Sequence, residues 1–221
     1  MPLLFKHTEP CLGVWKTEEN AEELLSLLAD KADYRLQLSE MRTENRKKEW
    51  LAVRVLLKEL LGDETTIAYR PNGAPFLPGS DMHISISHTK GYVAVILSEK
   101  PPTGIDIEYI GDRILKIKER FLSTEELKHI DPQHEREHLL IHWCAKETLF
   151  KMIGQEHVDF IEHLHVRPFT YKENGNLIVC ETRTNQAAVY ELSYCVYPDF
   201  IVVYSHCPIN PSISAACSSK L

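Results

Sequence analysis

The chain has 221 residues, of which 43% are hydrophobic and 26% charged, an ordinary composition for a folded globular protein. This length allows one large domain or two small ones with cores of their own. The formal net charge of -7 argues against a general nucleic-acid binder, because such proteins normally carry a basic surplus.

Nothing in the sequence predicts export or insertion into a membrane. The apolar run at the start ends at Phe5 and is too short for a signal peptide, and no window approaches the length of a membrane span. The six cysteines are scattered without a C-x-x-C pair, so neither a zinc ribbon nor a disulfide framework is indicated. We therefore expect a protein of the reducing cytoplasm.

A short strand and two helices are predicted for the beginning of the chain. The strand covers residues 12–15, and leucines at helical spacing predict an amphipathic helix over residues 18–30. A longer helix is expected over residues 39–61, with Ser39 as its N-cap and Gly62 as its C-terminal stop.

The longer helix carries the most concentrated basic surface of the chain, opposite an apolar face. Such a run can be a solvated helix face, or it can hold a phosphate. Arginine suits the second task because its planar fork donates two hydrogen bonds. The basic residues are Arg42, Arg46, Lys47, Lys48, Arg54 and Lys58.

A turn-rich loop over residues 70–75 and a β-hairpin are expected next. The hairpin strands cover residues 82–87 and 92–97, and His88 begins the tight connection between them. A histidine at such a turn is often structural, but imidazole can also donate a hydrogen bond to a phosphate oxygen.

Pro101 and Pro102 predict a boundary, because paired prolines interrupt regular structure. In the segment that follows, Gly104 to Glu108, isoleucines and acids alternate with the period of a strand. Asp106 and Glu108 therefore project side by side from one face. They form either the solvated face of an edge strand or two oxygen ligands for a hard cation such as Mg²⁺.

Two helix starts are expected after this strand. Residues 113–120 predict a short helix, and Ser123 with Glu126 three residues later has the pattern of a capping box. Farther on, His134 and His138 form an H-E-x-x-H pattern, which in zinc proteases supplies two metal ligands. The segment is highly charged and starts a helix, so a solvated helical run is the competing interpretation.

The helix that continues from there places Trp143, Glu147 and Lys151 at i, i+4 and i+8, on a single face. An ordinary surface pair of acid and lysine would explain the last two. If the helix meets the acidic strand, Glu147 becomes a third carboxylate and Lys151 a cation for phosphate.

The remainder of the chain is β-rich. Strands are predicted over residues 164–171, 177–181, 187–196 and 200–206, with a hairpin turn at Asn174-Gly175. Residues 208–221 are rich in Ser, Pro and Ala and are expected to be disordered.

The Gly104 to Glu108 segment, followed by Trp143 to Lys151, resembles the signature pair of the 4'-phosphopantetheinyl transferases, in their single-chain, pseudo-dimeric Sfp type. Both motifs are complete and in order, and the resemblance extends to about His206. It implies an α+β fold of two similar halves with the active site in the cleft between them. We assign residues 1–102 to the N-terminal half, 103–207 to the C-terminal half and 208–221 to the tail.

This resemblance implies transfer of 4'-phosphopantetheine from coenzyme A to a serine hydroxyl of an apo acyl or peptidyl carrier protein, with release of 3',5'-ADP. Asp106, Glu108 and Glu147 would hold Mg²⁺. Glu147 is the first choice to accept the serine proton, and Lys151 would stabilise the leaving phosphate. Together with Asp106 these two residues make up the expected catalytic set.

Coenzyme A would be held by the N-terminal half and by the lysines of the second motif. The R-x-x-E-W-L-x-x-R pattern resembles the family segment for the 3'-phosphate, and Ser87-His88-Thr89 resembles its S-H-S element. Ala74 departs from the family's Gly-Lys-Pro, so either another basic residue substitutes or binding is weaker there. The expected cofactor-binding residues are Arg46, Arg54, Ser87, His88, Lys146 and Lys151.

Other interpretations remain open. A non-catalytic module that binds coenzyme A or a carrier protein could keep the same fold, although it would not need three acids and Lys151. A zinc hydrolase built on His134 and His138 is the more distant alternative. In the family the Ser123 segment lies near the carrier-protein surface, and a monomer without nucleic-acid or membrane partners is expected.

Overall fold

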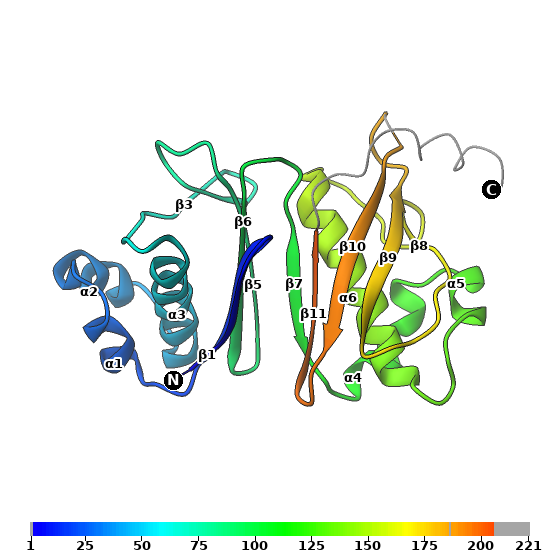
Figure 1. The fold of residues 1–221 in the computed structure, drawn as a ribbon, viewed down its shortest axis with the longest axis horizontal. Helices are drawn as coiled ribbons and strands as arrows, with labels where there is room; N and C mark the ends of the chain where they lie inside the picture. Colours follow the sequence, from blue (N-terminus) through cyan, green and yellow to red (C-terminus); the bar gives the residue numbers. More distant parts are fainter. Residues whose placement is uncertain (1, 186, 206–221) are drawn as a thin grey trace. The chain divides into compact units, whose positions relative to one another are not determined.

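The computed structural model describes residues 2–185 and 187–205, and the chain divides into two compact units, Met1–Glu99 and Lys100–Leu221 (Figure 1). We call them the N-terminal and the C-terminal unit. Each combines helices with an antiparallel sheet, which confirms the predicted α+β class. Among the described residues no helix is both long and apolar enough to cross a membrane. The tail predicted over residues 208–221 lies outside the described residues.

The N-terminal unit places helix α3 against a sheet with the strand order β1-β2-β6-β5. Helix α3 packs on β2 and β6, and leucines and valines from both layers form the core. The elements are β1 (Leu3–Thr8), β2 (Cys11–Lys16), α1 (Ala21–Ser26), α2 (Lys31–Ser39), α3 (Glu44–Leu61), β3 (Ala68–Tyr69), β4 (Pro75–Phe76), β5 (His83–Thr89) and β6 (Tyr92–Ser98).

The helix boundaries differ from the predicted ones. Ser39 does not cap the long helix, because it is the last residue of α2, and Thr43 instead accepts a hydrogen bond from the Arg46 backbone N–H. Helix α2 escaped prediction because Leu38 is its only buried residue, which leaves little apolar periodicity. Gly62 ends α3 as predicted, in the left-handed conformation with φ 85°.

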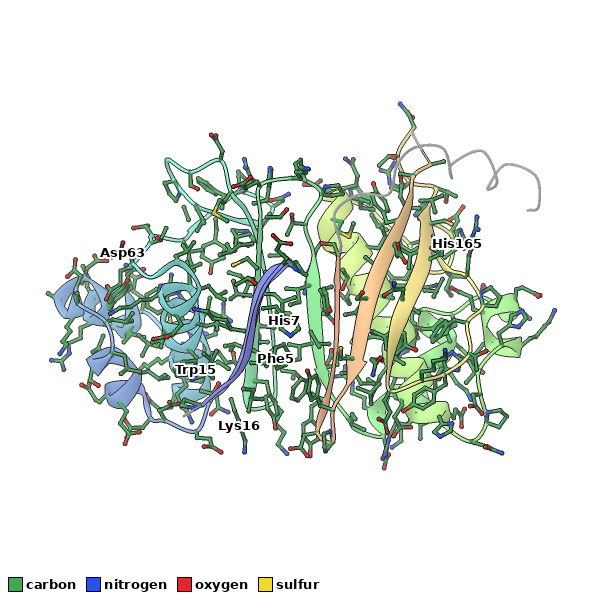
Figure 2. The ribbon with its side chains drawn as sticks, in the orientation of Figure 1. Phe5, His7, Trp15, Lys16, Asp63 and His165 are labelled. Atoms are coloured by element: carbon green, nitrogen blue, oxygen red, sulfur yellow. The ribbon has the colours of Figure 1, made fainter. Side chains whose placement is uncertain are left out.

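The N-terminal sheet is larger than predicted. Strand β1 was missed because it lies at the sheet edge and is mostly exposed. Phe5 and His7, two residues apart along β1, have ring centroids 5.3 Å apart (Figure 2). The predicted hairpin is present as β5 and β6, but His88 lies within β5, opposite Val93, and not in the turn.

The C-terminal unit places helix α6 against a sheet with the strand order β7-β11-β10-β9-β8 (Figure 1). The core lies between α6 and this sheet. The elements are β7 (Ile105–Tyr109), α4 (Arg113–Ile117), the 3₁₀ helix η1 (Lys118–Arg120), α5 (Thr124–Lys128), α6 (Glu135–Ile153), β8 (Leu164–Val166), β9 (Asn174–Glu181), β10 (Val189–Val196) and β11 (Phe200–Ser205).

The turn predicted at Asn174-Gly175 is wrong. Both residues are part of β9, where Gly175 lies opposite Tyr194 of β10. A Cβ at this position would stand 3.1 Å from the Tyr194 ring, so the glycine makes room for a buried aromatic side chain. Strand β8 is also shorter than predicted and ends at Val166.

The short elements between β7 and α6 mostly follow the predicted pattern. The helix expected over residues 113–120 is divided into α4 and η1. The capping box is confirmed, because Ser123 and Glu126 each accept the other's backbone N–H at the start of α5.

Candidate active site

The candidate site of the C-terminal unit begins with the close approach of β7 to α6. Gly104 precedes β7, and a Cβ added there would lie 2.7 Å from the Thr148 carbonyl oxygen and from Met152 Cγ of α6. The strand is also tied to its neighbour, because the Gly104 N–H donates to Ser205 Oγ at 3.0 Å. Only a glycine allows the helix to lie this close to the strand that carries the two acids.

Asp106 and Glu108 share the face of β7 that is covered by α6. In the sheet Asp106 lies opposite Val203 and Glu108 opposite Ile201. Both of these partners belong to the core beneath α6, and directly opposed residues point to the same face. The predicted projection of both acids to one side therefore agrees with the register.

Lys151 of α6 binds to the beginning of strand β7. Its ammonium group donates to Asp106 Oδ1 at 2.7 Å and to the Ile105 carbonyl at 2.9 Å. Asp106 is 5% exposed, and the Cys144 thiol of α6 is fully buried near it. Burial, followed by the negative charge of Asp106, raises the pKa of Cys144 well above its usual value, so the thiol remains protonated.

Glu147 precedes Lys151 by one turn of α6, and its side chain is half-buried. In the part of the chain that the structure describes, the Glu147 carboxylate forms no hydrogen bond or ion pair. Burial and then the charge of Asp106 raise its pKa to about 7, with a smaller contribution from Glu108 and an opposing one from Lys151. A carboxylate with this pKa can accept and release a proton near neutral pH.

The three carboxylates have the donor chemistry that Mg²⁺ requires, because this hard cation binds oxygen ligands and usually keeps several waters. Burial is the main cause of the raised pKa of Glu147, and the negative charges of Asp106 and Glu108 add to it; a cation would relieve this repulsion. Over residues 2–185 and 187–205, however, no group of three or more His, Cys, Asp or Glu side chains is arranged to hold a metal ion. The fit of Asp106, Glu108 and Glu147 to Mg²⁺ therefore depends on chemistry and charge, and the metal site stays a prediction.

Lys146 points away from this face. It is 0% exposed, and its ammonium group donates to the Phe121 carbonyl at 2.7 Å, the Phe160 carbonyl at 2.9 Å and Glu126 Oε2 at 2.8 Å. All three ammonium protons are thereby used. A phosphate contact would require breaking these bonds, so the structure gives Lys146 a structural role instead of the predicted cofactor contact.

The N-terminal unit contains a cavity of about 150 Å³ beside α3. Arg46 donates to His88 Nε2 at 3.1 Å. Because arginine cannot accept, the neutral imidazole carries its proton on Nδ1, which lies 3.6 Å from Glu49 Oε2. The structure thus brings the predicted Arg46 and His88 together. Glu49 was not predicted, although it is the glutamate of the R-x-x-E-W-L pattern.

Arg54 lines the same cavity and is largely fixed in place. Its guanidinium carbon lies 3.1 Å from the centroid of the Trp50 ring, and it donates to the Trp50 carbonyl at 3.0 Å. Burial lowers the pKa of Arg54 to about 10, so the side chain remains charged at neutral pH. The arginine is held by cation–π stacking and keeps donors for an anion.

Neither the predicted contact Ser87 nor Ala74, which stands where the family has a lysine, lines this cavity. Ile86 and His88 line it, and because side chains alternate along a strand, Ser87 points to the opposite face of β5. Ala74 lies in the connection between β3 and β4, where its N–H donates to Asn72 Oδ1 at 3.1 Å. Cofactor binding by Ser87 stays a prediction.

The H-E-x-x-H pattern has another explanation in the structure. His134 pairs with Asp131 at 2.9 Å just before α6, while His138 and His142 are each 1% exposed. The buried rings pack on Phe169, with centroid distances of 4.4 and 5.2 Å. His138 and His142 belong to the aromatic part of the core, and in the described residues no metal-binding group includes any of the three histidines.

Residues 102–198 match the family model described as the 4'-phosphopantetheinyl transferase superfamily. The chain is 29% identical over 142 residues to a 4'-phosphopantetheinyl transferase of Bacillus subtilis, which covers 58% of this chain and 62% of the relative. It is 30% identical over 118 residues to the 4'-phosphopantetheinyl transferase AcpT of Escherichia coli O157:H7, covering 49% and 59%. It is 31% identical over 112 residues to the 4'-phosphopantetheinyl transferase gsp of Aneurinibacillus migulanus, covering 48% and 46%. The chain thus spans at most 62% of the length of these relatives.

Proposed function

We propose that this chain, whose residues 102–198 match the family model of the 4'-phosphopantetheinyl transferase superfamily, transfers 4'-phosphopantetheine from coenzyme A to a serine hydroxyl of an apo carrier protein. The family resemblance deduced from the sequence is confirmed by this match. The proposal for the activity depends on one observation above all. Lys151 of α6 binds Asp106 of β7, and the half-buried Glu147, one turn before Lys151 on the same helix, is influenced by both charges.

Glu147 is the proposed proton acceptor. Its carboxylate would take the serine proton as the serine oxygen bonds to the β-phosphorus of coenzyme A. The bond from that phosphorus to the bridging oxygen breaks at the same centre, and 3',5'-ADP leaves. Positioning and charge stabilisation supply most of the rate in such phosphoryl transfers.

Lys151 is the proposed cation for the leaving phosphate. Its ammonium group is held at Asp106 Oδ1 and at the Ile105 carbonyl, which leaves one proton for a phosphate oxygen. Asp106, Glu108 and Glu147 would hold Mg²⁺, which when bound would neutralise charge on the pyrophosphate. Arg46, His88 and Arg54, which line one cavity, would bind phosphate groups of coenzyme A.

The proposed reaction can be tested by intact-mass spectrometry of an apo acyl carrier protein incubated with the full chain, coenzyme A and Mg²⁺. We expect a mass gain equal to one phosphopantetheine group, and no gain after EDTA treatment. Asp106→Ala and Glu147→Gln should abolish the gain, whereas Asp63→Asn, at an exposed position of the N-terminal unit (Figure 2), should not change it. Near-normal turnover of either site variant would refute the site assignment.

The same assay separates transfer from binding alone. A folded protein that binds coenzyme A but modifies no carrier protein of the acyl, peptidyl or related classes would be a binding module with the fold of the family. Because Glu147, Lys151 and the two strand acids are all present together, we favour transfer.

A further inference from the structure

Trp143 contacts one of the carboxylates of the candidate metal site. Its indole Nε1–H donates to Glu108 Oε1 at 3.1 Å, from α6 to β7. An indole can only donate, so it occupies one acceptor position of the carboxylate without neutralising its charge. The contact therefore restricts the orientation of Glu108 and leaves the carboxylate negative.

The indole itself is held by two aromatic side chains. The Phe121 ring meets it edge to face, with centroids 5.1 Å apart and an interplanar angle of 72°. The Phe160 ring lies on it at 5.6 Å and 34°. These two residues come from segments that are far apart in the chain, and together they limit the rotation of Trp143.

Lys146 ties both of these segments to α6. Lys146 follows Trp143 by three residues on the same helix. Its buried ammonium group donates to the carbonyls of Phe121 and Phe160. Glu126 compensates the charge and also accepts the Val166 N–H at 3.0 Å. The Phe121 and Phe160 rings, which we call the aromatic cage of Trp143, are thus fixed relative to the helix that carries the indole.

We propose that Trp143 is a positioning residue for metal binding: held in a cage that Lys146 anchors, its indole N–H orients the Glu108 carboxylate toward the cation. This inference rests on the proposed function, because only that proposal makes Glu108 a metal ligand. Groups that orient a metal ligand from outside its coordination shell typically contribute about 10–100-fold to metal affinity. We expect Trp143→Phe, which keeps an aromatic ring but lacks the donor, to lower the affinity at least tenfold by the same reasoning.

The chain provides a matched control. Trp15 also donates its indole N–H to a glutamate, Glu19 Oε2 at 3.4 Å, but in the N-terminal unit (Figure 2). Trp15→Phe therefore removes the same kind of contact without touching the candidate metal site. Any general effect of losing one indole and its hydrogen bond should appear in both variants.

The experiment is a titration of the full-length protein with Mn²⁺, in which free Mn²⁺ is measured by electron paramagnetic resonance. Wild type and Trp15→Phe should bind with the same Kd, and Trp143→Phe at least tenfold more weakly. If Trp143→Phe does not fold, as judged by circular dichroism, β-(3-benzothienyl)alanine at position 143 keeps the size of the indole and replaces the N–H by sulfur. Equal Mn²⁺ affinity of wild type and the folded variant, or no Mn²⁺ binding by the wild type, would overturn the inference.

Transfer assays with the same proteins keep this inference distinct from the proposed function. If the wild type modifies the carrier protein and Trp143→Phe binds Mn²⁺ normally, only the role of Trp143 is wrong. If Mn²⁺ binding depends on Trp143 and no carrier protein is modified, the proposed transfer fails and the positioning role stands.

Discussion

Replacing Lys146 by methionine is expected to destabilise the protein by about 3–5 kcal/mol, the range for breaking a buried ion pair by removing one partner. Lys146 is 0% exposed and Glu126 7%, so solvent cannot take over the contacts. The variant loses the two bonds to the Phe121 and Phe160 carbonyls and leaves the Glu126 charge buried without its cation. Hydrogen bonds that involve a charged group contribute about 1.5–3 kcal/mol each, which is consistent with this range.

The unfolding free energy should be measured in urea by the fluorescence of Trp143, with Trp15 and Trp50 replaced by phenylalanine. Adding Glu126→Gln to Lys146→Met removes the uncompensated charge and should recover part of the loss. Lys128→Met is the control, because the Lys128–Glu125 pair has the same type of contact at 2.6 Å but side chains 63% and 69% exposed. Exposed pairs contribute about 0–1 kcal/mol. A loss below about 1 kcal/mol for Lys146→Met would show that the buried network is not what holds α6 in place.

Three further outcomes are expected. Gly104→Ala should reduce transfer at least tenfold by mass spectrometry, because its Cβ would meet the Thr148 carbonyl at 2.7 Å and overpacking costs about 1–3 kcal/mol; an unchanged rate would contradict the close approach. Burial lowers the pKa of His142 from 6.5 to about 4. The contribution of the neutral His142 to the free energy of unfolding is therefore complete above pH 6.5 and falls by about 3 kcal/mol as the pH drops from 6.5 to 4. The difference between the urea midpoints of wild type and His142→Phe should therefore change between pH 6.5 and 4 and stay constant above pH 6.5. Arg46→Ala should weaken coenzyme A binding about tenfold in calorimetry and leave 3'-dephospho-coenzyme A unaffected, and an equal loss for both ligands would remove Arg46 from the 3'-phosphate.

The part of the candidate site that depends on local spacing could be predicted from the sequence. Alternation in β7 places Asp106 and Glu108 on one face, and the register against Val203 and Ile201 is in agreement. Helical spacing likewise predicts that Lys151 can reach this face. These relations follow from periods of two and 3.6 residues, which need no knowledge of the tertiary structure.

The environment of Lys146 could not be predicted in this way. A lysine is almost never fully buried unless it is paired, and its partners Phe121, Glu126 and Phe160 come from three segments distant in the sequence. The same limit explains the wrong turn at Asn174-Gly175. A strong local turn signal is overridden there by the Tyr194 ring across the sheet.

Helix α6 carries Trp143, Lys146, Glu147 and Lys151 on one continuous element. The number of residues between Trp143 and Lys151 should therefore be fixed. Inserting one residue after Glu147 would turn everything beyond it by about 100° around the helix axis, and the Lys151 ammonium would leave Asp106. An insertion in the segment after Gly154, where α6 has ended, displaces none of these groups along the helix. We therefore expect natural insertions and deletions in related chains to avoid residues 143–151 and to occur beyond the helix end.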